Sequence, residues 1–118
     1  MDIESLRRFC LSLPHATEGV QWDNDLLFRV GGKMFAVASL DVTPTRVSFK
    51  CTPEKFAELV EREGIKPAAY MARNHWVTLE RPDALEEAET ESLIRESYEM
   101  VWEKLTKKLR AELAANPN

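Results

Sequence analysis

The sequence is poor in the residues that stabilise small secreted proteins and bind most metals. Among its 118 residues it has two cysteines, Cys10 and Cys51, and two histidines, His15 and His75. The cysteines are isolated and form no Cys-x-x-Cys motif, so we expect two buried, reduced thiols and no disulfide framework. The histidines have no companion ligands at a recognisable spacing, and we therefore predict no zinc or other metal site.

The common catalytic and nucleotide-binding motifs are also missing. There is no phosphate-binding loop, no Gly-x-Ser-x-Gly elbow, and no Cys–His or carboxylate pair at an informative spacing. Gly31-Gly32-Lys33 indicates a turn and not a nucleotide cradle. Catalysis by His75 would need a partner within hydrogen-bond reach, and the sequence supplies no obvious one. We therefore expect a protein that is not an enzyme, with no catalytic residue and no cofactor.

Long apolar runs are absent, although 44% of the residues are apolar. No run approaches the roughly 20 residues that cross a bilayer, and the N-terminal residues lack the layout of a signal peptide. We expect a soluble cytoplasmic protein. The chain is long enough for one modest core and too short for two ordinary domains. We predict a single domain over residues 1–112 and a frayed C-terminal tail over 113–118.

The periodicity of the apolar residues predicts an α+β fold in which helices pack on one face of an antiparallel sheet. Asp2 is a suitable N-cap for the first helix, Gly31-Gly32 a tight hairpin turn, and Thr52-Pro53 the start of the second helix. The predicted order is a helix at 3–13, a connecting loop at 15–25 anchored by Trp22, strands at 26–30, 34–40 and 46–50, a helix at 54–63, an irregular link at 66–71, a strand within 74–80 and one long helix through 93–109.

Charge is distributed unevenly along the chain, whose net charge is −4. Outside the helix at 54–63, the stretch from 29 to 81 has a net charge of +5, because seven basic residues stand against two acidic ones. The rest of the chain, which is mostly helical, must then have a net charge of −9. We expect acidic helices to cover a basic sheet. The seven basic residues are Arg29, Lys33, Arg46, Lys50, Lys66, Arg73 and Arg81, and the acidic ones are Asp41 and Glu80.

Three short motifs, spaced as they are here, resemble a known family. They are Asn-His-Trp-Val-Thr-Leu-Glu at 74–80, Gly-Gly-Lys-Met-Phe at 31–35 and Lys-Cys-Thr-Pro-Glu at 50–54. Together they resemble the MmcQ/YjbR family of small bacterial proteins, and the likeness extends over about residues 3–110. The resemblance implies a CyaY-like α+β fold, also described as a double wing. It also implies DNA binding, a function commonly attributed to the family through its fold.

A basic sheet face gives this implied function a physical basis. Lysines and arginines on a twisted sheet can follow a phosphate backbone, while Trp76 or Tyr70 can stack on an exposed base. Val77 and Leu79 share the parity of His75, which favours His75 on the core side and Trp76 as the exposed aromatic on the open side. His75 can alternatively donate to a phosphate. The candidate nucleic-acid-binding residues are Lys33, Arg46, Lys50, Arg73, His75 and Trp76.

Two other interpretations of the same face remain open. The lysines and arginines can be an ordinary solvated surface that protects strand edges from aggregation. Alternatively, the face belongs to a protein-interaction or small-ligand module that uses Trp22, Tyr70 and Trp76 as aromatic anchors. Binding to DNA predicts an affinity that falls steeply with salt and depends on Lys50 and Arg73, whereas an apolar site predicts a weak salt dependence.

Overall fold

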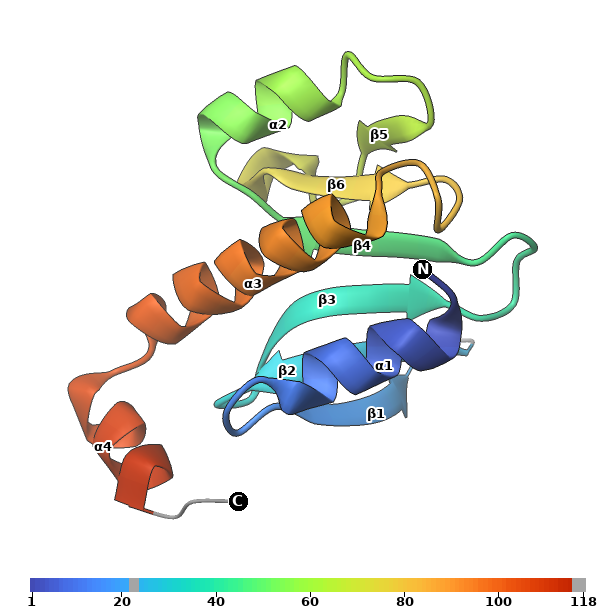
Figure 1. The fold of residues 1–118 in the computed structure, drawn as a ribbon. Coiled ribbons are helices and arrows are strands. Elements are labelled where there is room, and N and C mark those ends of the chain that lie inside the picture. Colours follow the sequence, from blue (N-terminus) through green and yellow to red (C-terminus); the bar gives the residue numbers. More distant parts are fainter. Residues whose placement is uncertain (22–23, 116–118) are drawn as a thin grey trace.

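A computed structural model, which describes residues 1–21 and 24–115, shows an antiparallel sheet with helices on one face (Figure 1). Within these residues the sheet has six strands in the order β1-β2-β3-β4-β6-β5. The strands are β1 (Thr17–Gln21), β2 (Asp25–Val30), β3 (Lys33–Ser39), β4 (Arg46–Lys50), β5 (Ile65–Pro67) and β6 (Trp76–Leu79). The helical elements are α1 (Ile3–Ser12), α2 (Pro53–Leu59), the 3-10 turn η1 (Ala72–Asn74), α3 (Glu87–Lys104) and α4 (Lys107–Ala115). The predicted α+β class with an antiparallel sheet is confirmed.

Local sequence signals set the helix starts and the central hairpin. The Asp2 carboxylate accepts a hydrogen bond from the Ser5 N–H at 2.8 Å, and the Thr52 hydroxyl accepts one from the Lys55 N–H at 3.2 Å. These contacts satisfy backbone donors that a helix N-terminus leaves free. Gly31 joins β2 to β3 with a φ of +59°, a conformation that favours glycine. The predicted caps and the predicted hairpin are therefore confirmed.

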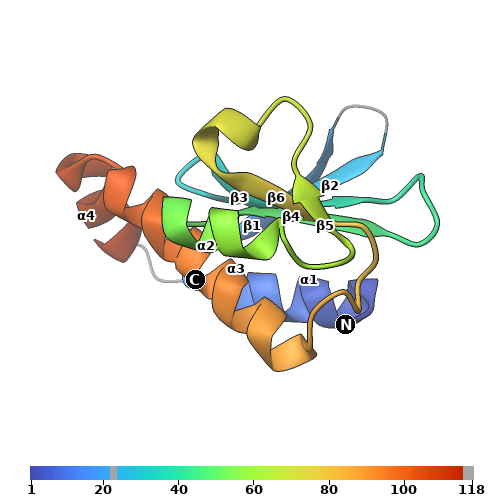
Figure 2. The same cartoon turned by 90° about the horizontal axis from the view of Figure 1, so that it is seen from above.

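The main core lies between the sheet and the pair α1 and α3, which Figure 2 shows together beneath the sheet. Strand alternation places Val47 and Phe49 of β4, and Val77 and Leu79 of β6, in this core. The facing predicted for both strands is confirmed. Cys10 and Cys51 are buried and free, as predicted. Burial raises the pKa of Cys10 to about 12 and that of Cys51 to about 11, so both thiols stay protonated at neutral pH.

A single buried hydroxyl joins α3 to the centre of the sheet. Ser97 Oγ donates to the Phe35 carbonyl at 2.7 Å and accepts from the Lys50 N–H at 3.0 Å. The side chain is fully buried, so water has no direct access to replace it. Ser97 therefore fixes α3 against β3 and β4 at once.

We expect Ser97→Ala to lower the free energy of unfolding by about 1–3 kcal/mol, because it leaves buried backbone groups without a partner. The measurement is urea unfolding followed by circular dichroism. Ser92→Ala is the matched control, since Ser92 is an exposed serine of the same helix; it should change stability by no more than about 0.5 kcal/mol. Equal losses in the two variants would contradict the role assigned to Ser97.

Two predicted irregular segments contain strands. The predicted loop at 15–25 contains β1, which pairs with β2 along its length. β1 lacks a buried apolar face, since its one large apolar residue, Val20, is 59% exposed, and it therefore gives no alternating signal. The predicted link at 66–71 overlaps β5, a three-residue edge strand that ends in Pro67. Trp22, the expected loop anchor, lies outside the described residues.

The helix boundaries also differ from those predicted. The prediction of a single long helix through 93–109 is wrong. Leu105 adopts an extended backbone and separates α3 from α4. Thr106 then caps α4, and its Oγ1 accepts a hydrogen bond from the Leu109 N–H at 3.1 Å. α2 ends at Leu59, before the predicted limit of 63. Residues as far as Ala115 are helical, so the expected frayed tail at 113–118 is helical in its first part, and 116–118 lie outside the described residues.

Candidate nucleic-acid interface

The sheet face opposite α1 and α3 is partly covered by its own second cluster. Leu27, Val37, Ala68 and Trp76 are buried there, with Met34 and Met71 packed against them. These residues come from β2, β3, β6 and the connection between β5 and β6. The predicted open face is therefore divided into an apolar patch and the polar surface around it.

Trp76 lies on the predicted side of the sheet, but it is not the exposed aromatic that we expected. It is only 6% exposed, because the connection between β5 and β6 folds back over it. The Ala68 N–H donates to the Trp76 carbonyl at 3.0 Å, and the Trp76 N–H donates to the Met71 carbonyl at 3.3 Å. Alternation along a strand predicts which face a side chain occupies and does not reveal a distant segment that covers it. In this conformation Trp76 has no free face for stacking.

Among residues 1–21 and 24–115, Tyr70 is the exposed aromatic of this face. Its side chain is fully exposed, and its backbone has a φ of +65°, which is unusual for a bulky residue. It lies in the segment that covers Trp76, so the fold buries one aromatic and projects the other. Tyr70 is one of the two stacking residues predicted from the sequence, but no periodic pattern around it indicates that it is the exposed one.

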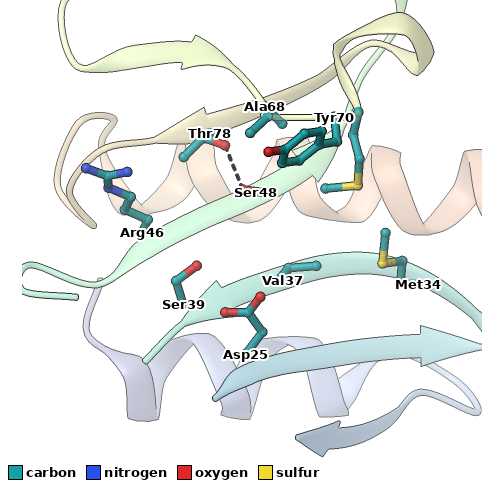
Figure 3. A pocket seen from close by; sticks show the side chains of 11 residues that line it. Asp25, Met34, Val37, Ser39, Arg46, Ser48, Ala68, Tyr70 and Thr78 are labelled. Carbon is teal, nitrogen blue, oxygen red and sulfur yellow. Dashed lines mark hydrogen bonds between the residues drawn. The ribbon is translucent and has the colours of Figure 1, made fainter. Parts of the chain in front are cut away.

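Tyr70 stands at the rim of a groove of about 550 Å³ on this face (Figure 3). The groove has an apolar part that includes Val37, Met34 and Met71. Its polar part includes Asp25 and Arg46, and a pair of hydroxyl groups, Ser48 and Thr78, whose oxygens lie 2.8 Å apart. The groove therefore combines an apolar surface with hydrogen-bonding groups of both kinds.

A second feature is a set of four cations, Lys33, Lys50, Arg73 and Lys104, which we call the basic cluster. Lys33, Lys50 and Lys104 line one depression, beside Met34 and Trp76. Lys50 and Lys104 also line the adjoining depression, which contains Arg73 and His75 and one acidic side chain, Glu103. β3, β4, η1 and α3 therefore bring their cations to one region.

Lys50 and Lys104 form a like-charge pair within the basic cluster. Lys50 is half-buried, and its pKa is lowered by burial and then by the neighbouring Lys104 amine. Each positive charge disfavours the other, and a bound anion would relieve this repulsion. Within residues 1–21 and 24–115, no member of the basic cluster forms a salt bridge.

Other cations of the sheet region are partly neutralised. Lys66 forms a salt bridge with Glu80 at 2.9 Å, and Arg81 forms one with Asp83 at 3.2 Å. Glu80 is already subtracted in the count of +5 for residues 29–81, but Asp83 lies beyond that stretch, so the count overstates the positive charge at this edge by the Arg81 charge. The count also does not reveal the concentration of positive charge at the basic cluster.

The other two predicted binding residues, Arg46 and His75, are not members of the basic cluster. Arg46 lies four residues from Lys50 on β4, which corresponds to about 13 Å along a strand, and it lines the groove instead. His75 precedes β6 with a φ of +64°, and its ring meets the Phe56 ring edge-on with centroids 5.6 Å apart. Its ring thus packs against α2 while it lines the depression that contains Arg73.

Lys104 is the member of the basic cluster that is absent from the predicted binding residues. Lys104 follows Val101 by three positions, and Val101 is buried against the sheet. Residues three apart share a helix face, so this spacing was the signal that placed Lys104 beside the sheet.

Two other kinds of feature, a metal site and a membrane-spanning helix, are not found among the described residues. No group of three or more histidine, cysteine, aspartate or glutamate side chains lies close enough together in 1–21 and 24–115 to hold a metal ion. Over the same residues, no helix has the length and apolarity needed to span a membrane.

Comparison with known proteins identifies the family. An Escherichia coli O157:H7 protein, described as uncharacterized protein YbdF, is 28% identical over 112 residues, which span 89% of this chain and 88% of that protein. The solved structure of Deinococcus radiodurans protein DR2400, a DUF419 domain, superposes with a TM-score of 0.86 and 32% identity, covering 96% of this chain and 88% of that one.

A solved structure from Pseudomonas syringae has a TM-score of 0.68 and 21% identity, covering 86% of this chain and 99% of that one, and it shares the fold. The YjbR family model matches residues 11–100 of the sequence. This match spans most of the chain, from the end of α1 to the last turns of α3. It agrees with the resemblance inferred from the three short motifs. The chain therefore belongs to the YjbR family.

Proposed function

We propose that the protein binds DNA weakly and without catalysis, through the basic cluster of Lys33, Lys50, Arg73 and Lys104. The observation that supports this most directly is the convergence of four cations without a salt-bridge partner among the described residues. Phosphate groups are the anions that such an arrangement suits, because several spaced positive charges can contact successive phosphates. His75 lines the depression that contains Arg73, and Arg46 lies farther along the same face in the groove; both extend the region available to a nucleic acid.

The salt dependence of such binding follows from the number of contacts. Each neutralised phosphate releases condensed counterions, so four contacts to duplex DNA give a slope of about −3.6 in log affinity against log salt. Affinity should therefore fall by roughly 100-fold between 50 and 200 mM salt. The repulsion between Lys50 and Lys104 adds to the driving force, since it is relieved when an anion enters.

We expect Lys50→Gln/Lys104→Gln to weaken binding of a fluorescently labelled 20-base-pair duplex by at least about 10-fold at 50 mM salt, measured by fluorescence anisotropy. The magnitude of the salt slope should decrease by about 2, because two phosphate contacts are lost. The matched control is Lys66→Gln/Arg81→Gln, which removes the same charge from cations that form salt bridges elsewhere.

Two outcomes would contradict the proposal. If both double variants weaken binding equally, only the net charge matters and the basic cluster has no special role. If the unmodified protein binds neither the duplex nor a single strand of the same length at 50 mM salt, the chain does not bind DNA at a useful affinity.

The groove beside Tyr70 favours a second candidate function, the binding of a small apolar or planar ligand or of a protein. Such binding would depend on Tyr70 and change little with salt, because its main contribution would come from apolar burial. A salt slope near zero would favour it over DNA binding.

A further inference from the structure

We propose that the nucleic acid bound here is single-stranded and that one unpaired base enters the groove beside Tyr70. This inference rests on the proposed function, because the basic cluster would hold the phosphates of the same strand. It adds the class of nucleic acid and the position of a base.

The Tyr70 ring is available for stacking. The ring is fully exposed at the rim of the groove, so no protein atoms compete with a ligand for its faces. The positive φ of this non-glycine residue is the kind of local strain that is concentrated at ligand clamps. A base can stack on an aromatic ring whatever its identity, because every base has a flat π-face.

The chemistry of the groove suits a base better than a phosphate. Figure 3 shows Tyr70 on the same side of the groove as Ala68, Ser48 and Thr78, with Val37 on the neighbouring strand across from it. Val37 and its apolar neighbours offer a surface for a planar ring, while the hydroxyl groups can bond to polar edges. The Asp25 carboxylate lines the same groove as Arg46, so the groove lacks the excess of positive charge found at the basic cluster, and the carboxylate can accept a hydrogen bond from the amino group of a base.

The groove and the basic cluster are continuous. Met34 lines both the groove and the depression that contains Lys33, Lys50 and Lys104. Ser48, in the groove, lies two residues from Lys50 on β4, about 6.6 Å along the strand. A single nucleotide can therefore place its base in the groove and its phosphate near Lys50.

This arrangement distinguishes single strands from duplexes. In a duplex the bases are stacked and paired, so none can enter the groove unless it is first unpaired and flipped out. A single strand has no pairing to break. The same phosphate contacts therefore allow tighter binding of the single strand.

The experiment compares three labelled 20-residue DNA probes by anisotropy at 50 mM salt: a mixed-sequence single strand, its duplex, and a single strand with an abasic central tract. We expect Tyr70→Ala to weaken single-strand binding by about 5- to 150-fold, which corresponds to the loss of one stacked base. Binding of the duplex and of the abasic strand should change less than 2-fold. Tyr70→Phe keeps the ring and should bind the single strand like the unmodified protein.

The outcomes separate this inference from the proposed function. The inference is overturned if Tyr70→Ala leaves single-strand affinity unchanged, or if the abasic strand binds as tightly as the intact one. If Lys50→Gln/Lys104→Gln still weakens binding in that case, the proposed function stands alone. If none of the three probes binds, both are wrong. Circular dichroism of Tyr70→Ala verifies folding, which we expect to be retained because the side chain is fully exposed.

Discussion

Phe35→Ala is expected to lower the free energy of unfolding by about 3–5 kcal/mol, the range for removing a phenylalanine from a core. Phe35 is completely buried in β3, and its ring packs edge-on against Tyr98 with centroids 5.4 Å apart. The Phe28 ring is tilted against the Phe35 ring, with centroids 6.5 Å apart. The neighbours belong to α3 and β2, so the cavity would open where the sheet meets its covering helix. Urea unfolding measured by circular dichroism would give the value.

This loss is large against the total stability of about 5–15 kcal/mol that is typical of small domains. Val20→Ala is the surface control, because Val20 is 59% exposed on the edge strand β1; it should cost no more than about 0.5 kcal/mol. If Phe35→Ala refolds with a loss below about 1 kcal/mol, the packing described between β3 and α3 is incorrect. Phe35→Leu, which retains part of the volume, should lie between the two.

Gly31→Val is expected to destabilise the fold by about 2–5 kcal/mol through two separate effects. The φ of +59° costs an L-residue roughly 1–2 kcal/mol. A Cβ at this position would also lie 2.6 Å from Leu105 Cδ1 and 3.3 Å from Leu109 Cδ2, which adds an overpacking cost of about 1–3 kcal/mol. The measurement is again urea unfolding. The clash falls where α3 ends and α4 begins, so the contact of α4 with the hairpin should weaken as well.

The adjacent glycine separates these two effects. Gly32 has a φ of +81°, but a Cβ there would meet no atom within 4 Å. Gly32→Val should therefore show only the conformational cost, and the difference between the two variants measures the clash. Leu105→Ala combined with Gly31→Val should recover part of that difference, as a double-mutant cycle would show. Equal effects of valine at the two glycines would contradict the packing of Leu105 on Gly31.

The sequence predicted the elements that bury an apolar face or begin with a cap. β2, β3, β4 and α1 have both a clear period and clear boundaries, and each lies where it was expected. β1 and β5 are edge strands that contribute backbone pairing more than apolar burial, so no alternation marks them. The interruption at Leu105 also preserves the apolar spacing, because Leu105 at the break and Leu109 in α4 both lie against Gly31.

The candidate site was harder to predict than the strands and helices, because it depends on distant segments of the chain that pack on the sheet. Lys50 and Lys33 come from strands whose facing the sequence shows, whereas Lys104 arrives on a helix far along the chain. Likewise, the pattern around Trp76 gives its side of the sheet correctly, but only the position of the 68–71 segment decides that Trp76 is buried and Tyr70 exposed. Such decisions depend on tertiary contacts that a single sequence does not encode locally.

The hydrogen bonds of Ser97 have a consequence for the spacing of the two lysines. Ser97 binds the Lys50 backbone, and Lys104 follows it by seven residues on the same helix, about 10.5 Å away. This hydrogen bond holds α3 against β4, so the backbones that carry the Lys50 and Lys104 ammonium groups keep a constant separation. A phosphate that docks between them has only to order their side chains, so less conformational entropy is lost than at lysines carried on loops.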